Sequence, residues 1–191
     1  HSGDSACVIP AQNIEKDTII KIKSQTKKIA LKLNVVGLLN IQFAIQNKKV
    51  YVIEVNPRGS RTVPFVAKSI GIPIAKIAAL VMSGEKLKSF NLPNDSNPKN
   101  YVSVKESVFP FSRFPGCKME LGPEMKSTGE VMGIDSNFAK AFAKSQISSG
   151  IDLPIKGNAF VSIKDSDKSL SIKICSSLIK LGFKILATSG T

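Results

Sequence analysis

The chain has 191 residues, 42% of them hydrophobic, which suits one domain, or one domain and part of another, with enough apolar side chains for a core. Its formal net charge is +13, from 27 basic and 14 acidic residues. Only three of the basic residues are arginines, and tryptophan is absent. Proteins that read nucleic acids usually combine arginine with exposed aromatic side chains. We therefore expect lysines spread over solvated faces and no nucleic-acid partner.

The sequence predicts neither a membrane span nor a signal peptide. The longest apolar stretch, 65–82, is interrupted by Lys68, Gly71 and Lys76, which favours a buried helix pair over a bilayer span. The chain opens on His1 without an initiator methionine, so we expect this end to be a cut. Its three cysteines are odd in number and match no zinc or disulfide spacing. We expect reduced, buried thiols in a cytoplasmic protein.

Hydrophobic periodicity predicts the elements of the first 150 residues. Apolar residues recur at helical spacing between lysines early in the chain, and alternate with polar residues in the following segments. Pro73 suits the first turn of a helix, and Gly84 follows its end. The predicted order is an amphipathic surface helix over 19–33, strands over 37–46 and 50–56, helices over 62–69 and 73–82, a surface loop over 85–100, a strand over 101–109, an irregular segment over 110–122, a strand over 129–133 and a helix over 137–146.

The pattern changes after a stretch of serine, glycine and proline at 148–154. We place a linker at 151–156, between one domain over 1–150 and a second over 157–191. The second part predicts a strand over 158–163, a helix over 170–181 and a strand over 183–188. This is one βαβ unit, which belongs to a parallel, doubly wound sheet. One such unit cannot bury both faces of its strands, so we expect a truncated domain.

The predicted hairpin gathers oxygen-bearing side chains. A three-residue turn at 47–49 would place Gln42 opposite Glu54, with Asn56 on the same face because strand side chains alternate. One carboxylate and two amide oxygens suit Mg²⁺ or Mn²⁺ shared with nucleotide phosphates. Spacing alone leaves open that these residues are simply the solvated face of the hairpin.

Two of the three arginines, Arg58 and Arg61, follow the hairpin directly. Since lysine supplies most positive charge here, a retained arginine suggests a need for its planar fork, which grips phosphate or acyl-phosphate oxygens in a bidentate manner. The alternative that both are ordinary surface charges remains open at this point.

The segment 53–58 resembles the Glu-x-Asn motif of the ATP-grasp superfamily. A longer, ordered set of segments resembles the large subunits of carbamoyl-phosphate synthetases. These segments are 1–5, 37–43, 54–65 and 121–133. The resemblance extends over nearly the whole chain and is weakest at 85–100.

This resemblance implies an α/β fold in two parts. The first is the C-terminal subdomain of an ATP-grasp unit, with a largely antiparallel sheet and helices. The second is the first βαβ unit of a doubly wound parallel, methylglyoxal-synthase-like regulatory domain. In this family only the second of two ATP-grasp units precedes that domain. The implied reaction is therefore phosphorylation of carbamate by ATP, which gives carbamoyl phosphate for pyrimidine and arginine biosynthesis.

The resemblance also implies site residues and partners. The family's metal ligands correspond to Gln42, Glu54 and Asn56. Its ATP-binding positions correspond to His1, Ser2, Gln42 and Glu54. Its catalytic, phosphate-facing arginines correspond to Arg58 and Arg61. Ser162, Lys168, Thr188 and Thr191 match contacts of an allosteric nucleotide. Hydroxyls and a lysine at the carboxyl edge of parallel strands also suit a phosphate, although serine and threonine often merely cap turns. The implied cofactors are ATP with Mg²⁺ or Mn²⁺, and the implied partner is a glutaminase small subunit.

Two rival interpretations remain. Another ATP-grasp carboxylate–amine ligase would share Glu54 and Asn56, but should lack the segment 121–133 and the βαβ unit behind it. A basic nucleic-acid-binding module would share the charge, but predicts clustered arginine and exposed aromatics. We also expect the 191-residue chain to be inactive by itself, because the phosphate-covering loop and lysines of an ATP-grasp unit are missing from it.

Overall fold

The computed structural model describes residues 3–93, 96–98, 100–116 and 118–191. The chain divides into two compact units, His1–Ile151 and Asp152–Thr191, which are described separately below.

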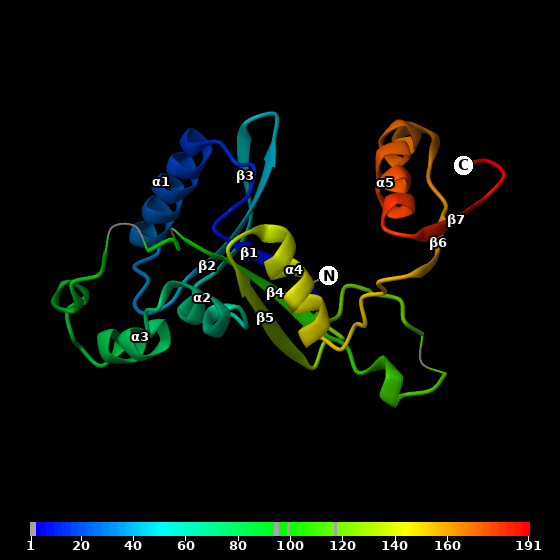
Figure 1. The fold of residues 1–191 in the computed structure, drawn as a ribbon. Helices are drawn as coiled ribbons and strands as arrows, with labels where there is room; N and C mark the ends of the chain where they lie inside the picture. Colours follow the sequence, from blue (N-terminus) through cyan, green and yellow to red (C-terminus); the bar gives the residue numbers. More distant parts are fainter. Residues whose placement is uncertain (1–2, 94–95, 99, 117) are drawn as a thin grey trace. The chain divides into compact units, whose positions relative to one another are not determined.

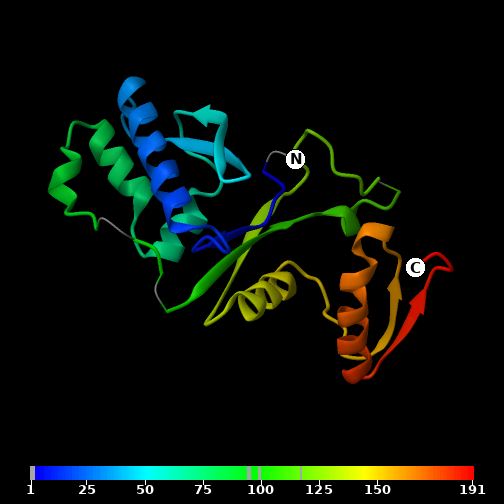
Figure 2. The same ribbon diagram turned by 90° about the horizontal axis from the view of Figure 1, so that it is seen from above.

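The first unit contains a three-stranded antiparallel sheet in the order β1-β4-β5. Its strands are β1 (Cys7–Ile9), β4 (Val102–Val108) and β5 (Gly129–Asp135), and α4 (Phe138–Ser148) packs along one side of β4 and β5 (Figures 1 and 2). The approach is close, because a Cβ on Gly133 would lie 2.1 Å from the Ala141 carbonyl oxygen and 2.5 Å from the Ser145 nitrogen. Val104, Ala141 and Ser145 are fully buried there, so this contact forms the core of the unit. β1 was not predicted from the sequence.

The second sheet of the first unit is the hairpin of β2 (Asn40–Gln46) and β3 (Lys49–Asn56). The predicted three-residue turn is wrong. Gln46 pairs with Lys49, and the turn consists of Asn47 and Lys48, whose φ angles are 49° and 63°. Two successive residues with positive φ are typical of the type I′ turn, whose twist matches that of the flanking strands.

A β-bulge then restores the predicted register at the site. Phe43 pairs with Val52, but the next residue, Gln42, pairs with Glu54, so that Ile53 is the extra residue of the bulge. Without it, the two-residue turn would place Glu54 opposite Ile41 and turn the carboxylate to the other face. The hairpin therefore reaches the predicted Gln42–Glu54 pairing through a shorter turn and a bulge.

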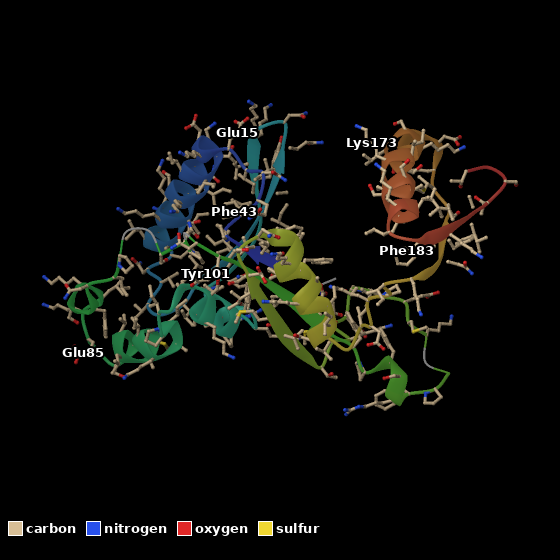
Figure 3. All side chains as sticks on the ribbon, in the orientation of Figure 1. Glu15, Phe43, Glu85, Tyr101, Lys173 and Phe183 are labelled. Atoms are coloured by element: carbon tan, nitrogen blue, oxygen red, sulfur yellow. The ribbon has the colours of Figure 1, made fainter. Side chains whose placement is uncertain are left out.

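Three longer helices complete the first unit: α1 (Lys16–Lys32), α2 (Val63–Ile70) and α3 (Ile74–Met82). Most of the predicted apolar face of α1 is half-buried, but Leu33, just past its end, is exposed, and so are Ile20 and Leu31 on the other side. Glu15, which is labelled in Figure 3, lies just before α1. It forms an ion pair with Lys48 in the turn of the hairpin, with 2.8 Å between Lys48 Nζ and Glu15 Oε1.

The predicted buried helix pair is buried only in part. Phe65, Ser69 and Ala78 are buried, but Met82 is 68% exposed. Among the described residues, no single helix is long and apolar enough to cross a bilayer; α2 and α3 meet that test only as a pair, which is bent by 113°. The predicted buried thiols also differ from the structure, because Cys7 and Cys175 are free and half-buried, while Cys117 lies outside the described residues.

Short 3-10 helices occupy parts of the segments predicted as irregular. They are η1 (Leu87–Phe90) and η2 (Phe111–Arg113). The remaining described residues of the predicted surface loop at 85–100 and of the irregular segment at 110–122 form no helix or strand.

The second unit is a βαβ arrangement. It consists of β6 (Gly157–Val161), the short η3 (Asp165–Asp167), α5 (Lys168–Lys180) and β7 (Phe183–Ala187). β6 and β7 pair in parallel, as the sequence predicts, and α5 packs against β7 (Figure 2). Apolar side chains remain exposed on both strands and on the helix, for example Phe160 at 70%, Leu186 at 52% and Ile172 at 67%.

Candidate functional site

The hairpin brings three of the predicted site residues together. Gln42 and Glu54 are directly opposed across β2 and β3, and both side chains are exposed. Opposed side chains share a face of the sheet, with Cβ atoms about 5 Å apart. Asn56 is half-buried, and its Nδ2 donates a hydrogen bond to Glu54 Oε1 at 2.6 Å. That bond orients the amide, so that the Asn56 oxygen is not turned toward the carboxylate.

This donor set fits a divalent cation that is shared with phosphates. It offers the Glu54 carboxylate and the Gln42 amide oxygen, which are hard ligands of the kind Mg²⁺ and Mn²⁺ prefer. The Asn56 oxygen would join them after its amide turns, because Nδ2 now faces Glu54. Within the described part of the chain, no group of three or more histidine, cysteine, aspartate and glutamate residues could hold a metal. A single carboxylate does not balance the two positive charges of such a cation, and nucleotide phosphates are one source of further negative charge.

The two arginines take different directions. Arg58 is exposed and its Nη1 donates to the carbonyl of the neighbouring Gly59 at 2.9 Å. Arg61 is half-buried; its Nη1 donates to Ser127 Oγ at 3.0 Å and also contacts Met125 Sδ. Arg61 is therefore anchored by a segment more than sixty residues away in sequence, whereas Arg58 rests on its own loop.

Asp4 and Ser127 join this network, and sequence reasoning did not select them. The Asp4 carboxylate is buried and accepts hydrogen bonds from the backbone N–H groups of Lys126 at 2.7 Å and Ser127 at 3.0 Å. Burial by itself would raise the pKa of Asp4, but these hydrogen bonds and the charge of Arg61 outweigh it and hold that pKa below its usual value. Asp4 lies in the matching segment 1–5 and Ser127 in the matching segment 121–133, but the match does not indicate that the two residues contact each other.

Two predicted ATP-binding residues, His1 and Ser2, lie outside the described residues. The structure begins at Gly3, next to Asp4.

The four predicted allosteric residues lie at the carboxyl edge of the second unit's sheet. Ser162 directly follows β6, Lys168 opens α5, and Thr188 directly follows β7. The Thr188 and Thr191 hydroxyls are 2.7 Å apart, and Thr191 Oγ1 accepts the N–H of Ile163 at 3.3 Å.

Lys168 closes this edge from the helix side. Its Nζ pairs with Asp165 Oδ1 at 2.6 Å and donates to the Gly190 carbonyl. A hollow of about 310 Å³ borders Ser162 and the first turns of α5. The edge thus combines hydroxyls, the ammonium groups of Lys164 and Lys168 and a helix N-terminus, which suit a phosphate group. It also carries the carboxylates of Asp165 and Asp167, which pair with those two lysines.

A family model described as "Carbamoyl-phosphate synthase L chain, ATP binding domain" matches residues 1–90, which include the hairpin and both arginines. Over its full length, the chain is 55% identical to the carbamoyl phosphate synthase large chain of Mesorhizobium japonicum and 52% identical to that of Synechocystis sp.. It is also 55% identical to the arginine-specific, chloroplastic large chain of Arabidopsis thaliana.

Over these residues, the chain belongs to the carbamoyl phosphate synthase large-chain family. The predicted family is thereby confirmed, and the rival interpretations are not favoured. The chain spans only 17% of the length of the Mesorhizobium relative and 16% of the Arabidopsis one.

Solved structures show the same fold at low sequence identity. One is a biotin carboxylase domain of a thermophilic 2-oxoglutarate carboxylase bound to ADP, with a TM-score of 0.50 and 18% identity over 69% of this chain and 34% of that one. Another is a single-chain, multi-domain long-chain acyl-CoA carboxylase, with a TM-score of 0.50 and 15% identity over 55% of this chain and 12% of that one. They confirm the predicted α/β, ATP-grasp-type fold with antiparallel sheets and helices.

Proposed function

We propose that this chain supplies the metal- and phosphate-binding part of the ATP-grasp unit that phosphorylates carbamate in a carbamoyl phosphate synthase. The observation that carries the proposal is the bulged hairpin, which places Gln42 opposite Glu54 and bonds Asn56 to that carboxylate. The match to an ATP-binding family model over residues 1–90 supports a nucleotide there.

Phosphoryl transfer from ATP asks a protein mainly to position the reactants and neutralise charge. A carbamate oxygen attacks the γ-phosphorus, the bond to the β-phosphate oxygen breaks, and carbamoyl phosphate and ADP result. Gln42, Glu54 and Asn56 would hold the cation, which when bound neutralises part of the phosphate charge. Arg58 and Arg61 would orient the phosphoryl group and its acceptor. No side chain has to act as a covalent nucleophile, so the cysteines have no role in this step.

The βαβ unit supports assignment to the second of the two ATP-grasp units. In the proposed arrangement, the domain over 1–150 is followed by a linker at 151–156 and by the start of a regulatory domain over 157–191. Ser162, Lys168, Thr188 and Thr191 would bind the phosphate of an allosteric nucleotide at its edge. A glutaminase small subunit would supply ammonia, and the 191-residue chain by itself would be inactive.

The test replaces one oxygen ligand in a complete large chain that carries this segment, assembled with its small subunit. Glu54→Gln keeps the shape of the side chain but removes the only carboxylate of the donor set. We expect carbamoyl phosphate formation to fall by about a hundredfold or more, while ATP hydrolysis that depends on bicarbonate stays near normal.

The matched control is Glu85→Gln, which alters another exposed carboxylate, labelled far from the hairpin in Figure 3. It should leave both reactions unchanged. An equal loss of both reactions in Glu54→Gln would contradict the assignment to the second unit, and full carbamoyl phosphate formation would contradict the site itself.

A further inference from the structure

The segment at the start of the described chain is tied to a distant loop by one carboxylate. Asp4 is only 8% exposed, and each of its oxygens accepts a different backbone N–H, Oδ2 from Lys126 at 2.7 Å and Oδ1 from Ser127 at 3.0 Å. A buried carboxylate with both oxygens occupied by backbone donors fixes the peptide that donates to it, because breaking either bond leaves a buried polar group unsatisfied. Asp4 therefore sets the path of the loop at 126–127.

That loop in turn holds Arg61. The Ser127 side chain is buried, its hydroxyl accepts a hydrogen bond from Arg61 Nη1 at 3.0 Å, and the same hydroxyl faces the Asp4 carboxylate. An arginine side chain has many rotamers, and a single orientation requires contacts that hold its end. The hydrogen bond to Ser127 is one such contact for Arg61. Asp4 in turn fixes Ser127 by accepting its backbone N–H.

Gly3 closes the same network from the other side. Its φ is +79°, and a Cβ there would lie 2.6 Å from Met125 Sδ and 3.6 Å from Arg61 Nη1. Ser107 Oγ also approaches the Gly3 carbonyl at 3.5 Å. A side chain at Gly3 would therefore crowd the end of Met125, whereas its distance to Arg61 would be an ordinary contact.

We propose that Asp4 is a positioning residue: through Ser127, it holds the Arg61 guanidinium in the orientation in which that group meets the transferring phosphoryl group. This inference rests on the proposed function for the role of Arg61. Its geometric part, the chain from Asp4 through Ser127 to Arg61, stands on the contacts above. Asp4 itself needs no contact with substrate for this role.

The first test uses Asp4→Asn and Ser127→Ala in the complete large chain with its small subunit. An amide at position 4 accepts only one of the two backbone N–H groups and turns its own N–H₂ toward the other. We expect kcat for carbamoyl phosphate formation to fall roughly tenfold to a hundredfold in each variant, with KM for ATP changed less than about twofold. Bicarbonate-dependent ATP hydrolysis should be retained.

The decisive comparison is made in the Arg61→Ala background. If Asp4 acts through Arg61, adding Asp4→Asn there should lower kcat by less than about twofold further. Additive losses, or equal losses of both ATP-dependent reactions, would indicate a general structural role and overturn the inference. Asp17→Asn, an exposed carboxylate in α1, is the matched control and should behave as wild type.

Two outcomes separate this inference from the proposed function. If Arg61→Ala leaves carbamoyl phosphate formation intact, the proposed role of the arginine fails. If Arg61→Ala is strongly impaired but Asp4→Asn and Ser127→Ala are both fully active, only the positioning inference fails. Should Asp4→Asn not fold, Ser127→Ala still decides, because it removes one hydroxyl and keeps both backbone bonds to Asp4.

Discussion

Lys105 on β4 is the largest side chain that the described part of the fold buries completely. It is 2% exposed, and its Nζ pairs with Glu130 Oε1 on β5 at 2.9 Å, while the glutamate is 14% exposed. Removing two charges from water is expensive, and such a pair is tolerated only while both partners are present. The opposite extreme is Lys48 with Glu15, whose side chains are 76% and 59% exposed.

This contrast predicts very different costs for breaking the two pairs. Glu130→Gln leaves the buried ammonium of Lys105 without a countercharge and should lower the free energy of unfolding by about 3 kcal/mol or more. Lys48→Met should lower it by less than about 0.5 kcal/mol. Urea denaturation measures both. The double variant Lys105→Met with Glu130→Leu should recover most of the loss, and a double variant as unstable as Glu130→Gln would contradict the explanation.

Asp135 at the end of β5 predicts a dependence of stability on pH. The hydrogen bond from Lys144, at 2.7 Å, and those from Ser136 lower the pKa of this carboxyl to about 2 from its ordinary 3.8. Because the folded pKa lies below the unfolded one, the stabilisation is complete above pH 3.8 and is lost as the pH falls toward 2. The difference in unfolding free energy between wild type and Asp135→Asn should therefore be constant from pH 7 to about 5 and shrink below 3.8. A difference that grows with acid would refute this assignment.

At the scale of elements, the contact between α4 and β5 decides the packing of the first unit. Only glycine fits at position 133, where a Cβ would meet the backbone of α4 at 2.1 and 2.5 Å and no flexible side chain could yield. Gly129 lies on the same strand and faces open space. Both positions are therefore glycines of β5, and they differ in whether another part of the chain lies next to the glycine.

Gly133→Ala should accordingly destabilise the chain by about 3 kcal/mol or more, because α4 has to move away from the sheet. Gly129→Ala should change the free energy of unfolding by less than about 0.5 kcal/mol. Thermal unfolding of the two variants checks this. Similar melting temperatures for both would mean that α4 does not pack against β5 as described.

The hairpin shows what a pattern of alternation can and cannot determine. Alternation correctly predicted two antiparallel strands with Gln42 opposite Glu54. The turn is one residue shorter than predicted, and the extra residue of the bulge, Ile53, restores that pairing. Neither positive φ at Lys48 nor a bulge is readable from side-chain polarity, since both are set by the backbone twist that joins the strands. The predicted pairing of Gln42 with Glu54 is confirmed because the alternation of polar residues depends on the face of the sheet and not on the length of the turn.

At the scale of the whole molecule, the proposed effector site in the second unit leads to a prediction about the regulation of carbamoyl phosphate synthesis. Two contacts hold the loop after β7: Lys168 on α5 donates to the Gly190 carbonyl, and Thr191 Oγ1 accepts the N–H of Ile163, which follows β6. Lys168→Ala combined with Thr191→Ala should flatten the ratio of carbamoyl phosphate synthesis with and without uridine or inosine monophosphate in the complete enzyme. Lys173→Ala, on the same helix and labelled in Figure 3, is the control and should keep the response. An unchanged ratio in the double variant would remove these residues from the proposed effector site.

The sequence by itself determined the family, the ATP-grasp-type fold, the parallel βαβ unit and the face of the hairpin that carries Gln42 and Glu54. These features depend on local order: motif spacing, periodicity and the alternation of side chains. The tertiary structure alone decided that Asp4 binds the loop at 126–127. It also decided that Arg61 donates to the distant Ser127, whereas Arg58 donates to its neighbour Gly59. Contacts between residues more than sixty positions apart depend on how sheets and loops pack, and no local pattern of side chains predicts which of them will meet.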